Sequence, residues 1–170
     1  MSTEFGAQVR EQLQRAGWYV LQVPHGTTLA ALREAGAPFK SNKYFQAQAS
    51  GTQEAPVLWN EVAYRGALLP ESLNRTYAEA AALVDELRGN LPGGAVPAIG
   101  PAALYVWLLV EHHRRHGEWL LQQRYTWAAD TAGTAHLVVG VFGQQRPLMV
   151  SPVPEATGRG IGALPLIVPE

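Results

Sequence analysis

The sequence predicts an α+β fold in which about four helices pack on a mainly antiparallel sheet of four to six strands. Helical patterns occupy most of the chain up to Gly117, and strand patterns joined by short turns follow, unlike the alternating order of a parallel α/β fold. The chain has 170 residues, of which 47% are hydrophobic, so it can form one substantial core. We therefore expect a single domain over residues 1–170.

Short helices and strands are expected to follow one another at the start of the chain. Phe5 and Leu13 share one face of a helix over residues 3–16, and Gly17 supplies its C-terminal stop. No clear pattern covers residues 37–56. The other predicted elements here are a buried strand over residues 18–23, a helix over 27–36 and a strand over 57–64.

The third predicted helix has the clearest start signal in the chain. Thr76 and Glu79 form a T-x-x-E capping box, in which each side chain can bond a free backbone N–H group of the first turn. This helix should end at Gly89, before a Pro- and Gly-rich segment at 91–100 that has the composition of a linker. A fourth helix should begin at Pro101, and it is apolar on almost every side, which predicts a central, buried position.

Three strands should follow as an antiparallel meander, because only short turns separate them. They are expected over residues 118–129, 135–142 and 147–153. A Gly-rich stretch at 157–162 and an apolar segment at 164–168 complete the sequence.

The composition limits the function classes. The chain has no cysteine, which excludes disulfides and thiolate metal sites. Its first residues have no signal-peptide pattern, and its longest apolar run, residues 102–110, is shorter than the roughly 20 residues that span a bilayer. We expect a soluble, cytoplasmic protein without membrane contact, and no motif indicates a cofactor.

Charge in this chain is balanced and sparse. It has 13 Lys and Arg against 14 Asp and Glu, and charged residues make up 16% of the sequence, compared with about 25% in an average domain. The net charge of −1 argues against nucleic acid as a partner. A folded monomer of this size exposes roughly 8,000 Å², so much of its surface would be uncharged, and we expect a homo-oligomer.

A pair of histidines near the end of the fourth helix suggests a metal site. His112 and His116 are four residues apart and share a helix face, a spacing that suits zinc or copper. No third ligand and no H-E-x-x-H pattern accompany them. Histidines at a helix C-terminus also interact favourably with the helix dipole, so the metal site is kept only as an alternative.

Two further patterns could bind anions. Glycines around Arg159 would let backbone N–H groups approach a small anion, although no helix follows, as it does in nucleotide-binding loops. Basic residues with aromatic neighbours, a combination that suits single-stranded nucleic acid, occur in two places. They are Lys40, Lys43, Tyr44 and Phe45, and then Arg124, Tyr125 and Trp127.

The meander gives the most specific hypothesis. Turns centred in the two short connections would pair Trp127 with Leu137, and Tyr125 with Val139, on a wholly apolar core face. Val141 would pair with Leu148 on that same face. The opposite, polar face would carry Gln122, Arg124, Thr126, His136, Val138, Gly140, Met149 and Ser151.

That polar face also contains the residue types of nucleophilic catalysis. His136 and Ser151 would lie diagonally on adjacent strands, with Asp130 in a nearby turn, although no G-x-S-x-G elbow is present. Polar residues on the outer side of a half-buried sheet also occur without any function.

The leading functional hypothesis is a non-catalytic ligand-binding or protein-interaction module that self-associates, with a small anion as one candidate ligand. Its expected binding residues are Arg124, Thr126, His136, Ser151 and Arg159. The first alternative is a small enzyme, either a hydrolase using His136 and Ser151 or a metal-dependent enzyme using His112 and His116. The second alternative is a single-stranded nucleic-acid binder.

Overall fold

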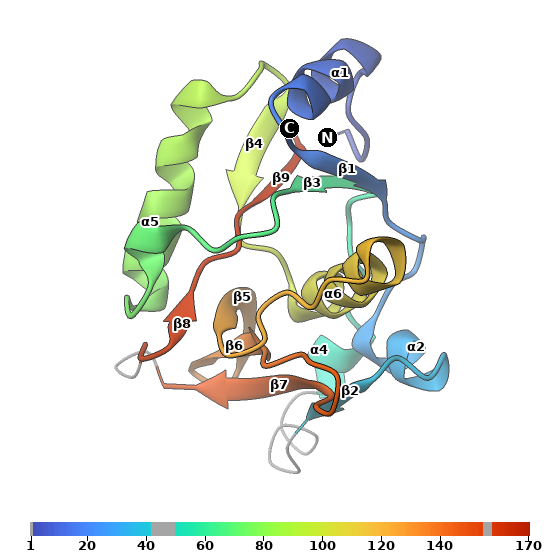
Figure 1. Cartoon of the computed structure of the whole chain (residues 1–170), viewed down its shortest axis with the longest axis vertical. Helices are drawn as coiled ribbons and strands as arrows, with labels where there is room; N and C mark the ends of the chain where they lie inside the picture. Colours follow the sequence, from blue (N-terminus) through green and yellow to red (C-terminus); the bar gives the residue numbers. More distant parts are fainter. Residues whose placement is uncertain (1, 42–49, 155–157) are drawn as a thin grey trace.

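A computed structural model describes residues 2–41, 50–154 and 158–170, and it confirms the α+β class (Figure 1). The α-helices in these ranges are α1 (Ala7–Arg15), α2 (Leu29–Glu34), α4 (Ser50–Glu54), α5 (Tyr77–Asp85) and α6 (Ala102–His116). Two 3-10 helices, Pro70–Ser72 and Glu86–Asn90, flank α5.

The strands divide between two sheets instead of forming the one sheet that the sequence suggests. Sheet A has the order β1-β3-β9-β4, and sheet B has the order β2-β7-β6-β5-β8. Sheet A contains β1 (Tyr19–Gln22), β3 (Glu61–Tyr64), β4 (Ala95–Ala98) and β9 (Leu166–Pro169). Sheet B contains β2 (Phe39–Ser41), β5 (Tyr125–Ala132), β6 (Ala135–Gly140), β7 (Leu148–Val153) and β8 (Ile161–Gly162).

Helix α6 lies between the two sheets and forms the centre of the core (Figure 1). Leu104, Tyr105 and Leu108 have no exposed surface, and they belong to a cluster that includes inward side chains of both sheets. An apolar helix needs apolar surroundings on all sides, and two sheets supply them where one sheet would cover only one side. No helix in the described ranges has the length and apolar character needed to cross a membrane.

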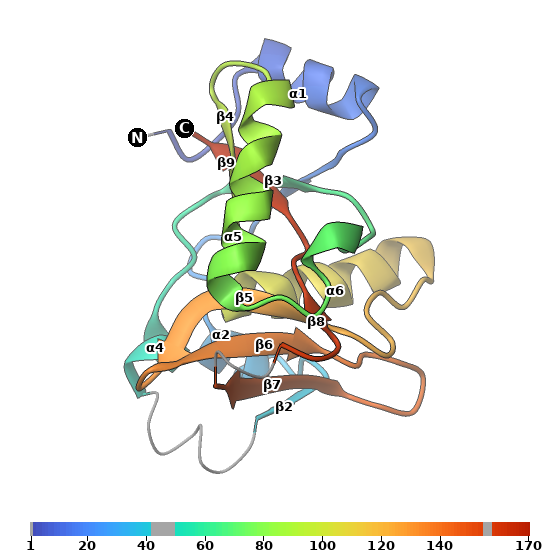
Figure 2. The ribbon, with the colours of Figure 1, turned by 90° about the vertical axis from the view of Figure 1, so that its left-hand side faces the viewer.

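Two other helices cover the outer surfaces of the sheets. Leu13 of α1 packs with Trp18, Ala63 and Ile167 on the side of sheet A that faces away from α6. Helix α5 runs beside both sheets (Figure 2), and its Ala80 and Val84 pack on Trp127 and Val138 of sheet B. Sheet B therefore has helical cover on part of each face.

The helix starts follow local signals in the sequence. Thr76 and Glu79 form the predicted capping box, with the Thr76 N–H donating to Glu79 Oε2 (2.9 Å) and the Glu79 N–H donating to Thr76 Oγ1 (3.3 Å). Helix α6 begins directly after Pro101, and Asp130 of β5 accepts a hydrogen bond from the free Ala102 N–H.

Two segments that resemble loops in the sequence contain strands. The linker-like segment at 91–100 includes β4, which pairs with β9. The Gly-rich stretch includes β8, which runs parallel to β5. Both strands are short and pair with residues far away in the chain, so local composition does not reveal them.

The C-terminal meander is confirmed, and the register of β6 with β7 is the predicted one. Both neighbouring pairs, β5 with β6 and β6 with β7, are antiparallel. Val139 pairs with Val150, and His136 lies on the same face as Ser151, in a diagonal position.

The predicted register of β5 with β6 was wrong by one residue. Trp127 pairs with Val138 instead of Leu137, and Thr126 pairs with Val139. The hairpin turns at Gly133 and Thr134, so that Ala132 pairs with Ala135, whereas the sequence interpretation centred the turn within residues 130–134. A β-bulge between Trp127 and Thr131 then changes the pairing by two residues, which keeps each side chain on its face. A shift of one residue moves a strand's side chains to the opposite faces.

The shift changes which β5 residues reach the surface. Thr126 is completely buried on the face that contacts α6, so it does not belong to the polar face. Tyr125 and Trp127 lie on the other face, together with Ser151 and His136.

Candidate functional site

A row of side chains on the outer face of sheet B forms the floor of a hollow. Lys40 of β2 is opposite Met149 of β7, Met149 is opposite Gly140 of β6, and Gly140 is opposite Tyr125 of β5. Side chains opposite one another in a sheet point to the same face. We call the resulting space, of about 330 Å³, the basic hollow. Its lining residues are Lys40, Tyr125, Val141, Arg146, Pro147 and Met149.

Two backbone features bring these strands close together. A side chain at Gly140 would overlap the carbonyl oxygen of Arg124 and lie 2.7 Å from the Tyr125 Cα, so only glycine allows this approach. Val141, which lines the hollow, has a φ of 52°, a left-handed conformation that a β-branched residue rarely adopts. The Val141 N–H donates a hydrogen bond to the Arg124 carbonyl (3.0 Å), which holds the end of β6 against the start of β5.

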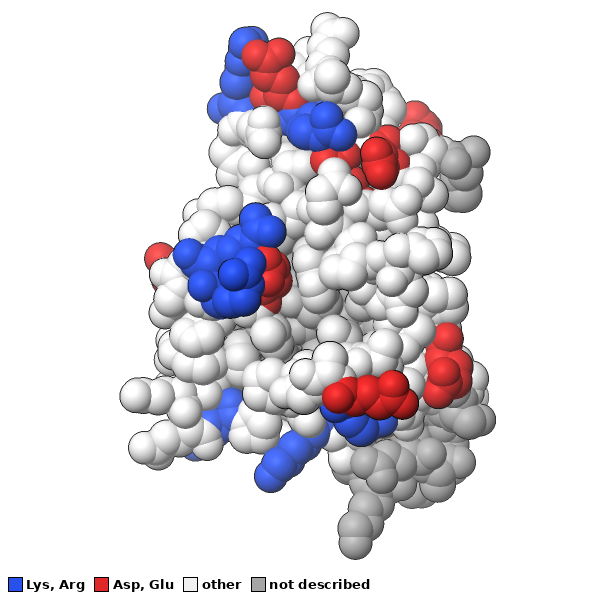
Figure 3. Space-filling view, turned by 90° about the vertical axis from the view of Figure 1, so that its right-hand side faces the viewer, with Lys and Arg blue, Asp and Glu red and all other residues white. Residues whose placement is uncertain are grey.

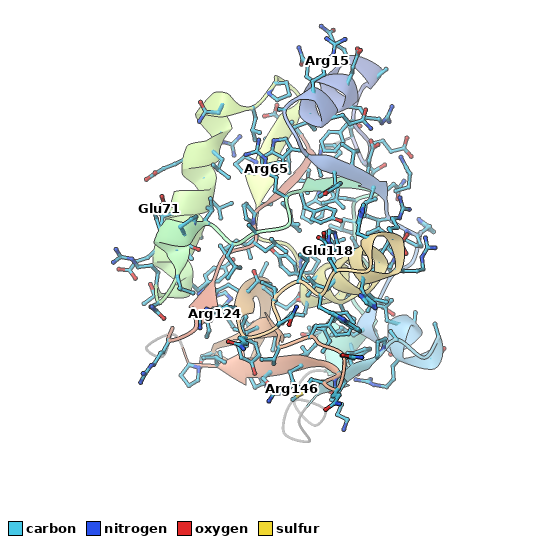
Figure 4. The ribbon with its side chains drawn as sticks, viewed as in Figure 1. Arg15, Arg65, Glu71, Glu118, Arg124 and Arg146 are labelled. Atoms are coloured by element: carbon cyan, nitrogen blue, oxygen red, sulfur yellow. The ribbon has the colours of Figure 1, made fainter. Side chains whose placement is uncertain are left out.

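Exposed cations without acidic partners gather around the basic hollow. Lys40 and Arg146 line it. Arg124 and Arg159 are not lining residues, but they lie in adjoining segments: Arg124 immediately precedes Tyr125, and Arg159 lies two residues before Ile161, which pairs with Tyr125. Figure 4 labels Arg124 and Arg146. Within the described ranges, none of these four side chains makes an ion pair or a hydrogen bond.

The arginines elsewhere in the structure are engaged. Arg10, Arg15, Arg75, Arg88, Arg114 and Arg115 form ion pairs with carboxylates. Arg65 donates to the Ala16 carbonyl and lies over the Trp18 ring, and Arg33 bonds Gln53 and Ser41. Arg33 and Arg65 thus lack an acidic partner in the described ranges but donate to neutral groups, whereas Lys40 and Arg146 bring unpaired positive charge to the basic hollow, which favours an anion there.

An amide-rich hollow of about 220 Å³ adjoins the basic hollow at Arg146, which lines both. We call it the glutamine hollow. Its lining residues are Gln122, Gln123, Gly143, Gln144, Gln145 and Arg146. No carboxylate of the described residues lines either hollow, so the described lining offers cationic and amide donors only, beside its apolar groups.

The sequence-predicted site residues divide into groups. Arg124 and Arg159 are exposed but do not line the basic hollow. Arg124 adjoins Tyr125, so strand alternation directs it away from the face that carries Tyr125. Ser151 is two residues from Met149 on the same strand and the same face, about 7 Å along β7. Thr126 faces the core, and its Oγ1 accepts a hydrogen bond from the buried Leu164 N–H (2.9 Å). It therefore has a structural role and does not line a binding surface.

His136 is largely occupied by an aromatic contact. The Tyr77 ring stacks on it with 3.5 Å between the ring centroids and an angle of 10° between the planes. Its Nδ1 is buried without a hydrogen-bond partner among the described residues. Asp130, the carboxylate of the catalytic hypothesis, bonds the Ala102 N–H instead, and burial raises its pKa. Ser151 and His136 thus share one face, but Asp130 is directed to the start of α6, and the three residues do not form a connected Ser-His-Asp chain.

The His112 side chain uses both ring nitrogens in contacts within the protein. Tyr64 Oη hydrogen-bonds Nδ1 (2.7 Å), and Glu118 Oε2 lies 3.4 Å from Nε2. Burial raises the Tyr64 pKa and lowers the His112 pKa, so the hydroxyl donates to a neutral imidazole. His116 is exposed, with 4.6 Å between its ring centroid and that of His112. No group of three or more His, Asp or Glu suited to a metal ion occurs within the described ranges.

Sequence reasoning missed Arg146, Met149 as a floor residue, and the Tyr77 stack on His136. Arg146 lies in a predicted turn, and it meets Lys40 because β2 pairs in parallel with β7, a contact that no local pattern indicates. The remaining part of the first basic-aromatic cluster, Lys43, Tyr44 and Phe45, lies outside the described residues.

Comparison with known proteins adds no functional information. The chain matches no protein-family model, and no curated protein or solved structure shows significant similarity to it.

Proposed function

We propose that this chain is a non-catalytic binding module that holds a small anionic ligand in the basic hollow. The observation that carries the proposal is that Lys40 and Arg146 line one concave surface without an acidic partner among the described residues. Arg124 and Arg159 are further cations in the segments that adjoin the paired residues Tyr125 and Ile161. Positive side chains that face each other without a counter-charge repel, and a bound anion removes that repulsion.

The lining indicates which anions fit. Lysine and arginine bind phosphate and carboxylate groups, arginine through two parallel hydrogen bonds. Tyr125, Met149 and Pro147 add an aromatic ring and apolar surface beside these charges. A volume of about 330 Å³ is at the lower end of the range for small-molecule sites. We therefore expect a small ligand that combines an anionic group with a flat apolar part.

Calorimetric titration with inorganic phosphate, adenosine monophosphate and adenosine tests this expectation. The monophosphate should bind more tightly than phosphate, because it adds contact with the ring and the apolar floor, and adenosine should bind most weakly. Arg146→Ala should weaken binding of the monophosphate roughly 10- to 100-fold, because a hydrogen bond to a charged group contributes about 1.5–3 kcal/mol.

Arg15→Ala is the matched control, since it removes the same charge at the opposite end of the molecule (Figure 4). Arg15 pairs with Glu11 on α1 and should leave binding unchanged. If the wild type and Arg146→Ala bind adenosine monophosphate with equal affinity, the basic hollow is not the binding site. A single-stranded oligonucleotide that binds far more tightly than the monophosphate, with strong salt dependence, would favour the nucleic-acid alternative.

We also propose that the module self-associates. The chain exposes 8652 Å² with only 13 basic and 14 acidic side chains to cover it. Figure 3 shows that the charged side chains of one face form separate groups divided by broad uncharged surface. Two molecules with so few charges on their surfaces meet little electrostatic repulsion when they associate. Sedimentation velocity at micromolar concentration should give a species heavier than 18.4 kDa, and a single monomeric species would contradict the proposal.

A further inference from the structure

Strand β1 is an edge strand of sheet A with an open side. Its neighbour is β3, and no other described strand pairs with it (Figure 1). A hollow of about 570 Å³ extends along this side. Its lining residues are Gln14, Gly17, Trp18, Tyr19, Val20, Leu21, Arg115 and His116. The end of α1 and the end of α6 thus flank β1, but they leave space beside it.

The hydrogen-bond pattern shows which backbone groups face this space. The Val23 N–H donates to the Asn60 carbonyl (2.8 Å), so these two residues form a hydrogen-bonded pair of the antiparallel ladder. Such pairs alternate along a strand. The N–H and C=O groups of Val20 and Gln22 therefore point away from β3, toward the open side.

The other edge strands carry features that oppose pairing. Strand β4 contains Pro97, β8 has two residues, and β2 has three residues with Lys40 at its centre. Proline, lysine and very short length are the usual protections of a sheet edge. Strand β1 has none of them, and the segment from Trp18 to Val23 has no charged side chain.

One of the two large hydrophobic side chains that remain exposed among the described residues lines this hollow, and the other lies beyond one end of the strand. They are Tyr19, which is 43% exposed at the start of β1, and Leu58, which is 74% exposed in the segment that leads into β3. Because β3 is antiparallel to β1, Leu58 lies beyond the other end of β1. Exposed apolar groups at both ends of an unpaired strand are typical of an association surface.

We propose that β1 is the self-association surface and that it pairs antiparallel with β1 of a second copy. This inference rests on the proposed self-association and names its interface. Val20 and Gln22 are placed symmetrically about Leu21, so a two-fold axis at Leu21 would pair Val20 with Gln22 of the second copy, twice. All four outward-facing residues of the two strands would then be hydrogen-bonded, in one continuous eight-stranded sheet.

The second copy is the favoured occupant because the strand is complementary to itself. Its side chains are neutral, so two copies do not repel each other along the edge. The nearest cation of the rim, Arg115, is already paired with Glu111 (2.5 Å), which leaves little positive charge to select an acidic foreign peptide.

Cysteine cross-linking tests both the surface and the register, because the natural chain contains no cysteine. Val20→Cys and Gln22→Cys variants are prepared separately, mixed and oxidised, and the products are separated by mass. The proposed register predicts that the mixed disulfide forms faster than either symmetric disulfide, because only residues 20 and 22 are directly opposite. Circular dichroism verifies that each variant is folded. A Leu83→Cys variant, placed on α5 away from β1, is the control and should not cross-link.

The outcomes separate this inference from the proposed self-association. Sedimentation of the wild type as a monomer would overturn both. The wild type could be a dimer while the mixed Val20→Cys and Gln22→Cys variants do not cross-link, or cross-link no faster than the Leu83→Cys control. That result would overturn the β1 surface alone. A dimer in which the symmetric 20–20 disulfide dominates would overturn the register about Leu21. If both cysteine variants are unfolded, the Val20→Pro variant replaces them, because proline removes one outward N–H group of β1. The inference predicts that this variant is monomeric. A Val20→Pro variant that still dimerises would overturn the β1 surface.

Discussion

Thr126 connects β5 to the segment before β9 through its hydroxyl group, and replacing it with valine tests the register of the meander. Its Oγ1 accepts from the Leu164 N–H (2.9 Å) and donates to the Trp127 carbonyl (3.2 Å). Beside it, Tyr105 Oη donates to the Leu164 carbonyl (2.7 Å). The backbone N–H and C=O groups of Leu164, just before β9, are thus hydrogen-bonded by side chains of β5 and α6 and not by a neighbouring strand.

The expected cost follows from the burial of these groups. Valine has nearly the shape of threonine, so Thr126→Val leaves almost no cavity and removes mainly the acceptor. An unsatisfied buried N–H group costs about 1–3 kcal/mol. The free energy of unfolding should fall by about that amount, and for a chain of this size each kcal/mol lowers the Tm by about 2–4 °C.

Urea unfolding of the two proteins measures the effect directly. Thr134→Val, in the exposed turn between β5 and β6, is the control and should change the free energy of unfolding by less than about 0.5 kcal/mol. If Thr126→Val is as mild as the control, Thr126 lies on a solvent-exposed face. That result would favour pairing of Trp127 with Leu137, and it would refute the register described here.

Three further changes have defined outcomes. Thr76→Ala should lower the stability by about 1 kcal/mol in urea unfolding, because it removes the side-chain cap of α5. Gly140→Ala should reduce both the thermal stability and the affinity for adenosine monophosphate, because its Cβ displaces the main chain beside the basic hollow. Burial lowers the His112 pKa below 6.5, so the unfolded chain takes up this proton more readily, and the stability should fall as the pH drops below about 6.5. In unfolding curves from pH 7.5 to 5, His112→Gln should flatten this dependence, whereas the exposed His25→Gln should retain it.

Local chemistry explains which elements the sequence could predict. The capping box at Thr76, the start of α6 after Pro101 and its stop at Gly117 depend on neighbouring residues alone. The central place of α6 follows from its apolar surface. The meander was predictable for the same reason, because its short turns allow only antiparallel neighbours.

Distant pairing explains what the sequence could not show. The separation into two sheets depends on β9, which joins β3 to β4 from the far end of the chain. The turn lies at Gly133 and Thr134 and not in the middle of the 130–134 connection, and this difference decides whether Thr126 or Tyr125 reaches the surface. The candidate site was predicted in part, since Arg124, Arg159 and Lys40 were singled out separately. The place of Lys40 beside Arg146 in the basic hollow depends on the parallel pairing of β2 with the distant strand β7.

The two proposed surfaces should act independently, and this follows from their positions. The basic hollow belongs to sheet B and the open edge to sheet A, they share no lining residue, and α6 lies between the sheets. A ligand changes an association equilibrium only if it binds the monomer and the dimer with different affinities. Saturating adenosine monophosphate should therefore leave the dimer dissociation constant from sedimentation equilibrium unchanged. A shift would instead identify α6 as the connection, since its body contacts β5 and β6 while its end, at Arg115 and His116, borders the β1 edge.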